Sequence, residues 1–209
     1  MPITIDTFVL GPLETNAYVI QTGGVCAVID PGWESADILN LIAGRKLHLE
    51  MILLTHGHGD HIAGVAALKD ACPDAKLCCP KEDLAMLESP AANLSGMFGL
   101  KIVCPPADVT IQAPQSLELG GIEIRVLDTS GHTRGGVSYY LPGEAVVFTG
   151  DALFAGSIGR TDIPGGSASK LLRNIRDNLL SLEKITRVFP GHGQATSVEE
   201  EARSNPFFK

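Results

Sequence analysis

The chain lacks clusters of basic side chains. Its 209 residues carry 16 Lys and Arg against 24 Asp and Glu, and the longest basic run is Arg45-Lys46. Because proteins bind nucleic acids through phosphate contacts from clustered Lys and Arg, we expect no nucleic-acid partner. The chain also lacks the run of about 20 apolar residues that spans a membrane, and its first residues lack the features of a secretory signal. We therefore expect a soluble, cytoplasmic protein that binds no membrane.

The cysteines form no C-x-x-C pair, and their number, five, is odd. Most of them lie in apolar, strand-like surroundings. This placement is typical of reduced core residues in the cytoplasm, and it disfavours a disulfide framework. With 44% hydrophobic residues, a chain of this length forms one domain with a sizeable core.

The hydrophobic pattern predicts strands with interspersed helices in both halves of the chain. Strands are expected at 3–10, 16–20, 25–29, 49–54, 76–79, 121–128, 136–141, 145–149 and 185–189, and helices at 34–43, 61–71, 168–182 and 196–203. The acidic pair Glu82-Asp83 indicates the start of a further short helix. Residues 90–100 and 153–166 are expected to be loops, the first with exposed apolar side chains. This order indicates an α/β (α+β) chain with two mixed sheets packed face to face and helices outside.

The densest group of polar side chains lies where the buried strand 49–54 ends. His56, His58, Asp60 and His61 fall within six positions, and the two glycines between them allow a tight backbone. Neutral imidazole and carboxylate are the ligands expected for zinc or another first-row divalent metal. The stretch predicts a metal site on a strand-to-helix loop.

Three more donors each follow a predicted strand and stand beside a glycine: His132, Asp151 and His192. A lone histidine after a strand is usually structural, but the dense motif makes these three candidates together. Seven donors exceed what one catalytic zinc uses, about three protein ligands. Two ions that share a carboxylate would use them all, and Asp151 is the natural bridge because a carboxylate has two oxygens. The sixth histidine, His48, lies outside this pattern.

The motifs H-x-H-x-D-H, G-H-T, G-D and G-H-G occur in this order over nearly the whole chain, which resembles the metallo-β-lactamase superfamily. The resemblance implies a four-layer αββα sandwich, with one metal on His56, His58 and His132, a second on Asp60, His61 and His192, and Asp151 bridging. It also implies that Asp30 holds a ligand histidine in its tautomer; the alternative is a turn residue in Asp-Pro-Gly. Many true β-lactamases have Cys at the position of Asp151, which argues against that activity.

Residues 148–162 resemble the glyoxalase II group, the hydroxyacylglutathione hydrolases, and especially their short bacterial relatives. In that family a basic residue at the position of Arg160 binds a glutathione carboxylate; the alternative is a structural pair with Asp162. Longer members continue into a helical domain with further glutathione contacts. Here 209 − 192 = 17 residues follow His192, so we expect one domain over 1–209 without that helical domain. The acyl group, the thiol and the oligomeric state stay open.

The resemblance implies a metal-dependent thioester hydrolase that cleaves S-acylglutathione-like, small-molecule substrates by a metal-bridging hydroxide. Asp60 and Asp151 are the expected catalytic residues, and the expected cofactors are two zinc ions, with iron or manganese as alternatives. One rival is a persulfide dioxygenase with a single iron on His56, His132 and Asp151. Other rivals are a lactone hydrolase of the same superfamily and a metal-binding protein without catalysis.

Overall fold

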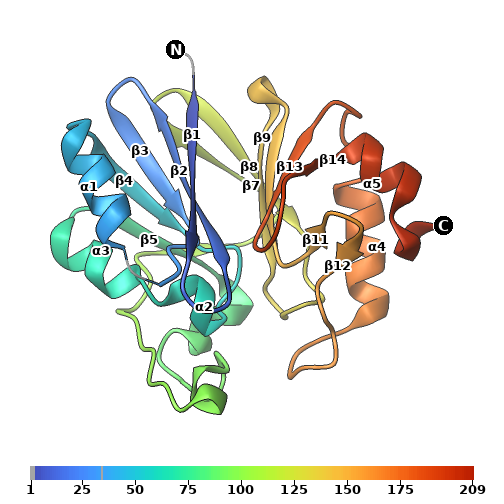
Figure 1. Cartoon of the computed structure of the whole chain (residues 1–209), viewed down its shortest axis with the longest axis horizontal. Helices are drawn as coiled ribbons and strands as arrows, with labels where there is room; N and C mark the ends of the chain where they lie inside the picture. Colours follow the sequence, from blue (N-terminus) through green and yellow to red (C-terminus); the bar gives the residue numbers. More distant parts are fainter. Residues whose placement is uncertain (1–2, 34) are drawn as a thin grey trace.

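Two six-stranded β-sheets pack face to face, with helices on both outer faces (Figure 1). The computed structural model describes residues 3–33 and 35–209. The four-layer αββα sandwich expected from the sequence is confirmed. Within the described residues, no helix is both long and apolar enough to cross a membrane.

The first sheet is built from the first half of the chain. In spatial order its strands are β1 (Thr4–Leu10), β2 (Thr15–Thr22), β3 (Val25–Ile29), β4 (His48–Leu53), β5 (Lys76–Pro80) and β6 (Val109–Ile111). The first three strands form an antiparallel meander, and β3 to β6 are parallel to one another. Parallel strands require crossover connections, and these hold α1 (Ala36–Gly44), α2 (Gly59–Ile62) and α3 (Val65–Ala71).

The second sheet is built from the second half. In spatial order its strands are β14 (Thr196–Ser197), β13 (Arg187–Pro190), β10 (Val146–Gly150), β9 (Val137–Leu141), β8 (Ile122–Asp128) and β7 (Gln115–Leu119). A small hairpin of β11 (Leu153–Phe154) and β12 (Ser157–Ile158) leaves this sheet after β10. The helices α4 (Ala168–Asn178) and α5 (Val198–Ser204) lie beside it (Figure 1).

Alternation along the strands sorts the apolar side chains into three layers of core. In β2, Val19 faces α1 and α3, whereas its neighbours Tyr18 and Ile20 face the other sheet. In β10, Val147 faces α4 and Phe148 faces the first sheet. Because successive side chains of a strand point to opposite faces, strands buried on both sides are apolar throughout. The continuous apolar runs in the sequence reflect this double burial.

The helix predicted at 61–71 is divided into α2 and α3. Gly64 lies at the division, and its N–H donates to the carbonyl of Pro31 at 2.8 Å. A Cβ at Gly64 would lie 2.2 Å from Ser35 Oγ and 2.7 Å from the Pro31 carbonyl oxygen. The close approach of this second segment, and not a local helix signal, divides the helix. The helix predicted at 34–43 corresponds to α1, and its first position, 34, lies outside the described residues.

Other differences concern short elements. The strands β6, β7, β11, β12 and β14 were not predicted, and the predicted glycine-rich loop 153–166 contains the β11–β12 hairpin. The predicted loop 90–100 contains a short 3₁₀ helix, η2 (Ser95–Phe98). The predicted helix start at Glu82-Asp83 belongs to a second 3₁₀ helix, η1 (Lys81–Met86).

Candidate metal centre

The seven predicted donors lie at one end of the joint between the two sheets. In the first sheet, β3 and β4 are parallel, so Asp30 and the loop after β4 emerge at the same edge. In the second sheet, β8, β10 and β13 run in the same direction and deliver His132, Asp151 and His192. Several hydrogen bonds join the sheets beside the site, and two of them come from β9. The Tyr139 hydroxyl donates to the Leu54 carbonyl at 2.7 Å, and the Val137 N–H donates to the Thr55 carbonyl at 2.9 Å.

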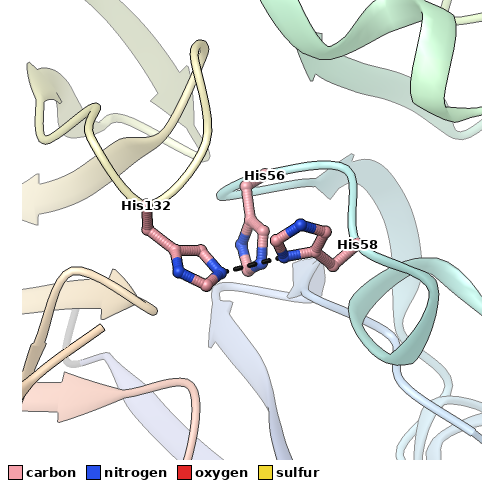
Figure 2. A group of neighbouring side chains, drawn as sticks. All are labelled: His56, His58 and His132. Carbon is pink, nitrogen blue, oxygen red and sulfur yellow. Dashed lines mark hydrogen bonds between the residues drawn. The ribbon is translucent and has the colours of Figure 1, made fainter. Parts of the chain in front are cut away.

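The first group of donors consists of His56, His58 and His132. Figure 2 shows the three imidazole rings converging, two from the loop after β4 and one from the loop after β8. His58 Nδ1 and His132 Nε2 are 2.9 Å apart. Burial and the neighbouring histidines lower the pKa of His58 to about 3 and the pKa of His56 well below its usual value. These two rings are therefore neutral at pH 7, the state in which imidazole binds a metal.

The second group consists of Asp60, His61 and His192. The Nε2 atoms of His61 and His192 lie 3.5 and 3.3 Å from Asp60 Oδ2. Burial alone would lower the pKa of His61, but the charges of Asp60, Asp151 and Asp30 raise it well above its usual value. Burial also opposes protonation of His192, and the contact with Asp60 raises its pKa. The negative charge at this group therefore favours a cation, which is supplied either by protons or by a metal ion.

Asp151 lies between the two groups. Its Oδ1 is 3.3 Å from His61 Nε2 and 3.6 Å from His192 Nε2, whereas its Oδ2 is 3.5 Å from His132 Nε2. One carboxylate oxygen thus faces each group. His48 is exposed at the start of β4 and belongs to neither group.

The donor set fits divalent metal ions. The buried atoms His56 Nε2, His61 Nε2 and Asp151 Oδ1 have no hydrogen-bond partner among the described residues, and all three face the donor groups. Leaving buried polar atoms unpaired is costly unless another ligand satisfies them. Two donors on one tetrahedral zinc, each bonded at about 2.0–2.2 Å, lie about 3.3–3.6 Å apart. The separations around Asp60 and Asp151 match this spacing.

Four of the five histidines are anchored through Nδ1. The Nδ1–H groups of His61, His132 and His192 donate to the Asp30 carboxylate at 2.9 Å, the Arg160 carbonyl at 2.8 Å and the Leu13 carbonyl at 3.0 Å. His56 Nδ1 contacts Thr55 Oγ1, whose hydroxyl donates to Asp30 at 2.6 Å, so His56 is the hydrogen donor in that pair. Anchoring fixes the tautomer and leaves Nε2 free to bind a metal.

Asp30 therefore does more than terminate a turn. Its carboxylate is 2% exposed, and it accepts hydrogen bonds from the Thr55 N–H, the Thr55 hydroxyl and His61. These contacts favour the orienting role over the turn alternative, although Gly32 N–H also closes a turn on the Asp30 carbonyl.

Several residues at the site were not identified from the sequence. The Thr15 hydroxyl donates to Asp60 Oδ2 at 3.0 Å, and the carbonyls of Leu13 and Arg160 accept hydrogen bonds from His192 and His132. A backbone carbonyl has no sequence signal, because any residue supplies one. Asp83, interpreted as a helix-start residue, is 1% exposed and contacts the loops of the site. The sequence around Asp83 offers one signal, an acidic residue shortly after Pro80. This signal does not distinguish a residue at the start of a helix from a residue that holds the loops of the site.

The Arg160 side chain pairs with Asp162. Two hydrogen bonds of 2.8 Å join the guanidinium to the carboxylate, and both side chains are about two-thirds exposed. This is the structural alternative considered for Arg160. The residue also lines the pocket described next, so binding of a substrate carboxylate stays a prediction.

A pocket of about 300 Å³ opens over the donors. Its walls are mostly apolar. Leu13 lies in the turn between β1 and β2, Trp33 follows β3, and Phe98, Leu100 and Ile102 belong to the segment around η2. Phe98 is 65% exposed, as expected for an apolar side chain of the loop 90–100, and it lines the pocket. Met97, at 78% exposed, is also outside the core.

The fold and the donor set define a metallo-hydrolase of the αββα type. The chain belongs to the metallo-beta-lactamase superfamily, whose family model matches residues 10–192. Two curated relatives that cover most of the chain are both named as hydrolases. The probable metallo-hydrolase YqgX of Bacillus subtilis is 37% identical over 95% of this chain and 94% of its own. The hydroxyacylglutathione hydrolase GloC of Haemophilus influenzae is 36% identical over 87% of this chain and 86% of its own.

Three solved structures share this fold over most of both chains. The B3 metallo-beta-lactamase BLEG-1 has a TM-score of 0.95 and 37% identity, with 99% of this chain and 100% of that chain covered. TTHA1623 in a di-iron-bound form has a TM-score of 0.85 and 41% identity, with coverage of 97% and 99%. ETHE1 from Myxococcus xanthus has a TM-score of 0.80 and 30% identity, with coverage of 97% and 83%. The chain is a metal-dependent hydrolase of this superfamily.

Proposed function

We propose that the chain is a thioester hydrolase of the hydroxyacylglutathione hydrolase type, with two zinc ions and S-acylglutathione-like substrates. The observation that carries the two-ion site is the Asp151 carboxylate, with Oδ1 toward His61 and His192 and Oδ2 toward His132. The similarity to GloC, which covers most of both chains, supports the thioester substrate. We place the whole activity in this one domain.

The donor residues differ in the charge that they bring to the site. When bound, two divalent ions supply Lewis acidity and hydroxide at neutral pH. Asp60 and Asp151 offset part of the positive charge of the ions, and the neutral His56 and His58 add none. The Thr15 hydroxyl holds Asp60 Oδ2 in place. Asp60 would therefore also orient a water molecule that lies between the two groups. The leaving thiolate needs no strong general acid, because a thiol has a pKa of about 8.5.

The pocket suits a substrate with an apolar part and one carboxylate at its rim. Leu13, Trp33 and Phe98 offer apolar contact beside the donors. The Arg160 guanidinium pairs with Asp162, but water and salt screen an exposed ion pair of this kind, so a substrate carboxylate can replace Asp162 at little cost. Arg160 is therefore the proposed carboxylate-binding residue.

A persulfide dioxygenase is the second candidate, and the similarity to ETHE1 favours it. A single iron on His56, His132 and Asp151 would leave Asp60, His61 and His192 without a common role. Their complete and closely spaced arrangement supports the hydrolase. The di-iron form of TTHA1623 keeps iron as an alternative metal in a two-ion site.

The test combines metal analysis with three assays on the purified, metal-loaded protein. We expect two equivalents of metal, hydrolysis of S-lactoylglutathione and no oxygen uptake with glutathione persulfide. His58→Ala and Asp151→Ala should abolish hydrolysis with the fold intact, whereas His48→Ala should not change it. Wild-type turnover in either of the first two variants would refute the donor assignment. Oxygen uptake with persulfide would establish the dioxygenase, and cleavage of a β-lactam or a lactone in place of the thioester would redirect the substrate class.

A further inference from the structure

A second buried carboxylate lies behind the first donor group without touching a donor. Asp83, in η1, is 1% exposed. It accepts hydrogen bonds from the Thr133 hydroxyl at 2.6 Å, the Gly135 N–H at 2.8 Å and the Gly57 N–H at 3.2 Å. A buried carboxylate is costly unless it is hydrogen-bonded, so these three contacts are what permit it there.

The partners of Asp83 belong to the two loops that carry the first donor group. Gly57 stands between His56 and His58, and Thr133 directly follows His132. These loops come from different sheets, one after β4 and the other after β8. Asp83 is therefore a shared anchor for two segments whose relative position decides the distance between His58 Nδ1 and His132 Nε2.

The second donor group has other anchors. His61 is held by Asp30, Asp60 by Thr15, and His192 by the Leu13 carbonyl. The three hydrogen bonds that Asp83 accepts come from residues outside this group. Disturbing Asp83 thus reaches the first group directly and the second only through the rest of the fold.

The loops also pack closely against η1. A Cβ at Gly57 would lie 2.7 Å from Met86 Cβ, and a Cβ at Gly135 would lie 2.9 Å from the Asp83 carboxylate carbon. Glycine at these two positions lets the backbone N–H groups reach the carboxylate. The contact is therefore built into both loops and does not depend on a flexible side chain.

We infer that Asp83 is a positioning residue that sets the metal affinity of the first donor group separately from that of the second. The inference rests on the proposed division of the donors into two groups. Outer residues that hold metal ligands typically change affinity by about 10- to 100-fold when they are mutated. An amide at position 83 keeps one acceptor oxygen but replaces the other with a donor. In place of Oδ2 this donor would face the Gly57 N–H and the Thr133 hydroxyl, and in place of Oδ1 it would face the Gly135 N–H.

The chain offers a matched control in Glu201. This carboxylate is also 1% exposed, and it accepts from the Thr196 hydroxyl at 2.7 Å, the Asn205 amide at 2.7 Å and the Gly156 N–H at 2.9 Å. These partners lie outside both donor groups. Glu201→Gln therefore measures the general effect of neutralising a buried, triply bonded carboxylate.

The experiment measures two zinc affinities on the full chain by competition with a chromophoric chelator. His58→Ala and His192→Ala identify which affinity belongs to which group. We expect Asp83→Asn to weaken the first-group affinity by about 10- to 100-fold and the second by less than twofold. Thr133→Val should show a smaller loss at the same group, and Thr133→Ser, which keeps the hydroxyl, should bind like the wild type. Glu201→Gln should leave both affinities unchanged.

The cobalt-substituted protein gives a readout that does not depend on activity. Its visible spectrum reports ligand geometry, so Asp83→Asn should alter the bands that His58→Ala removes and leave the others. The inference is overturned if Asp83→Asn weakens both groups equally, matches Glu201→Gln, or leaves the first-group affinity at its wild-type value. If Asp83→Asn does not fold, the Thr133 pair decides by the same criteria. If His58→Ala and His192→Ala both bind zinc normally, the donor assignment fails and the inference fails with it.

Discussion

Replacing Asp30 by asparagine should remove the hydrogen bond that fixes the tautomer of His61. The carboxylate accepts from three donors: the Thr55 N–H at 2.7 Å, the Thr55 hydroxyl at 2.6 Å and His61 Nδ1–H at 2.9 Å. An amide of the same shape accepts with its oxygen only. If that oxygen keeps the Thr55 N–H, the amide NH₂ takes the place of Oδ2 and faces both the Thr55 hydroxyl and His61 Nδ1. The hydroxyl can rotate and accept from the amide, but the ring must move its proton to Nε2 or leave two donors opposed.

The magnitude follows from the contact that is lost. A hydrogen bond to a charged group contributes about 1.5–3 kcal/mol, and an unpaired buried donor costs about 1–3 kcal/mol. Two of the three contacts end on Oδ2; the Thr55 hydroxyl can reverse its hydrogen bond, whereas the His61 contact is lost. We therefore expect metal-free Asp30→Asn to be destabilised by about 2–3 kcal/mol. For a domain of this size, a change of 1 kcal/mol moves Tm by about 2–4 °C, so the expected fall is about 4–12 °C.

Two measurements test this reasoning. Thermal unfolding of the metal-free protein gives the Tm shift, and nitrogen-15 NMR of the imidazole rings, recorded above the raised pKa of His61 where the ring is neutral, gives the tautomer of His61. The control is Asp6→Asn, which removes a surface pair with Arg45 and should change stability by less than about 0.5 kcal/mol. An unchanged Tm together with a proton still on His61 Nδ1 would refute the account of Asp30.

Three further results are expected. Acidification from pH 7.5 should release the ion of the second group before the ion of the first group. The pKa values of His61 and His192 are raised, so protons compete with the metal for these two rings as the pH falls. The metal that the protein retains after desalting at each pH measures the order of release. Simultaneous release would contradict this order. At pH 8 an aromatic disulfide should label Cys72, which is half-buried, well before the other cysteines. Burial raises the pKa of all these thiols, but the others are fully buried, and the pKa values of Cys26, Cys78 and Cys104 rise to about 12. Equal labelling rates would contradict the described burial. Gly57→Ala should lower the free energy of unfolding, measured in urea, by about 1–3 kcal/mol, because the new Cβ would lie 2.7 Å from Met86 Cβ. The control Gly44→Ala meets nothing within 4 Å and should not destabilise the protein. Equal urea midpoints for the two variants would contradict the close packing at Gly57.

Much of the architecture is readable in the sequence because double burial leaves a strong pattern. Apolar runs such as Val25–Ile29 and Val146–Gly150 are strands in the structure, and the order of strands and helices gives the two mixed sheets. Short elements such as β6 and the β11–β12 hairpin escape, because two or three residues carry no periodicity. The break between α2 and α3 escapes for a different reason, since it depends on Pro31 and Ser35, which are distant in sequence.

The donors of the site are readable for a related reason. Each follows a strand and stands near a glycine, and strands that run in the same direction bring their ends to one edge of a sheet. The structure brings all seven together, and their role as ligands stays a prediction. The anchors behind them are different. Asp83 meets Thr133 across 50 positions, and Leu13 meets His192 across 179, so no local pattern marks either pair.

The placement of the donors has a consequence for folding. The first sheet ends at Ile111 and the second begins at Gln115, and each donor group takes members from both sides of that link. Neither half alone carries the whole of either group, so an ion held by either group would require the sheets to be docked. By linkage, an ion at 100 times its dissociation constant would stabilise the docked state by about 2.7 kcal/mol. Metal supply would then set not only turnover but also how firmly the two halves of the sandwich stay together.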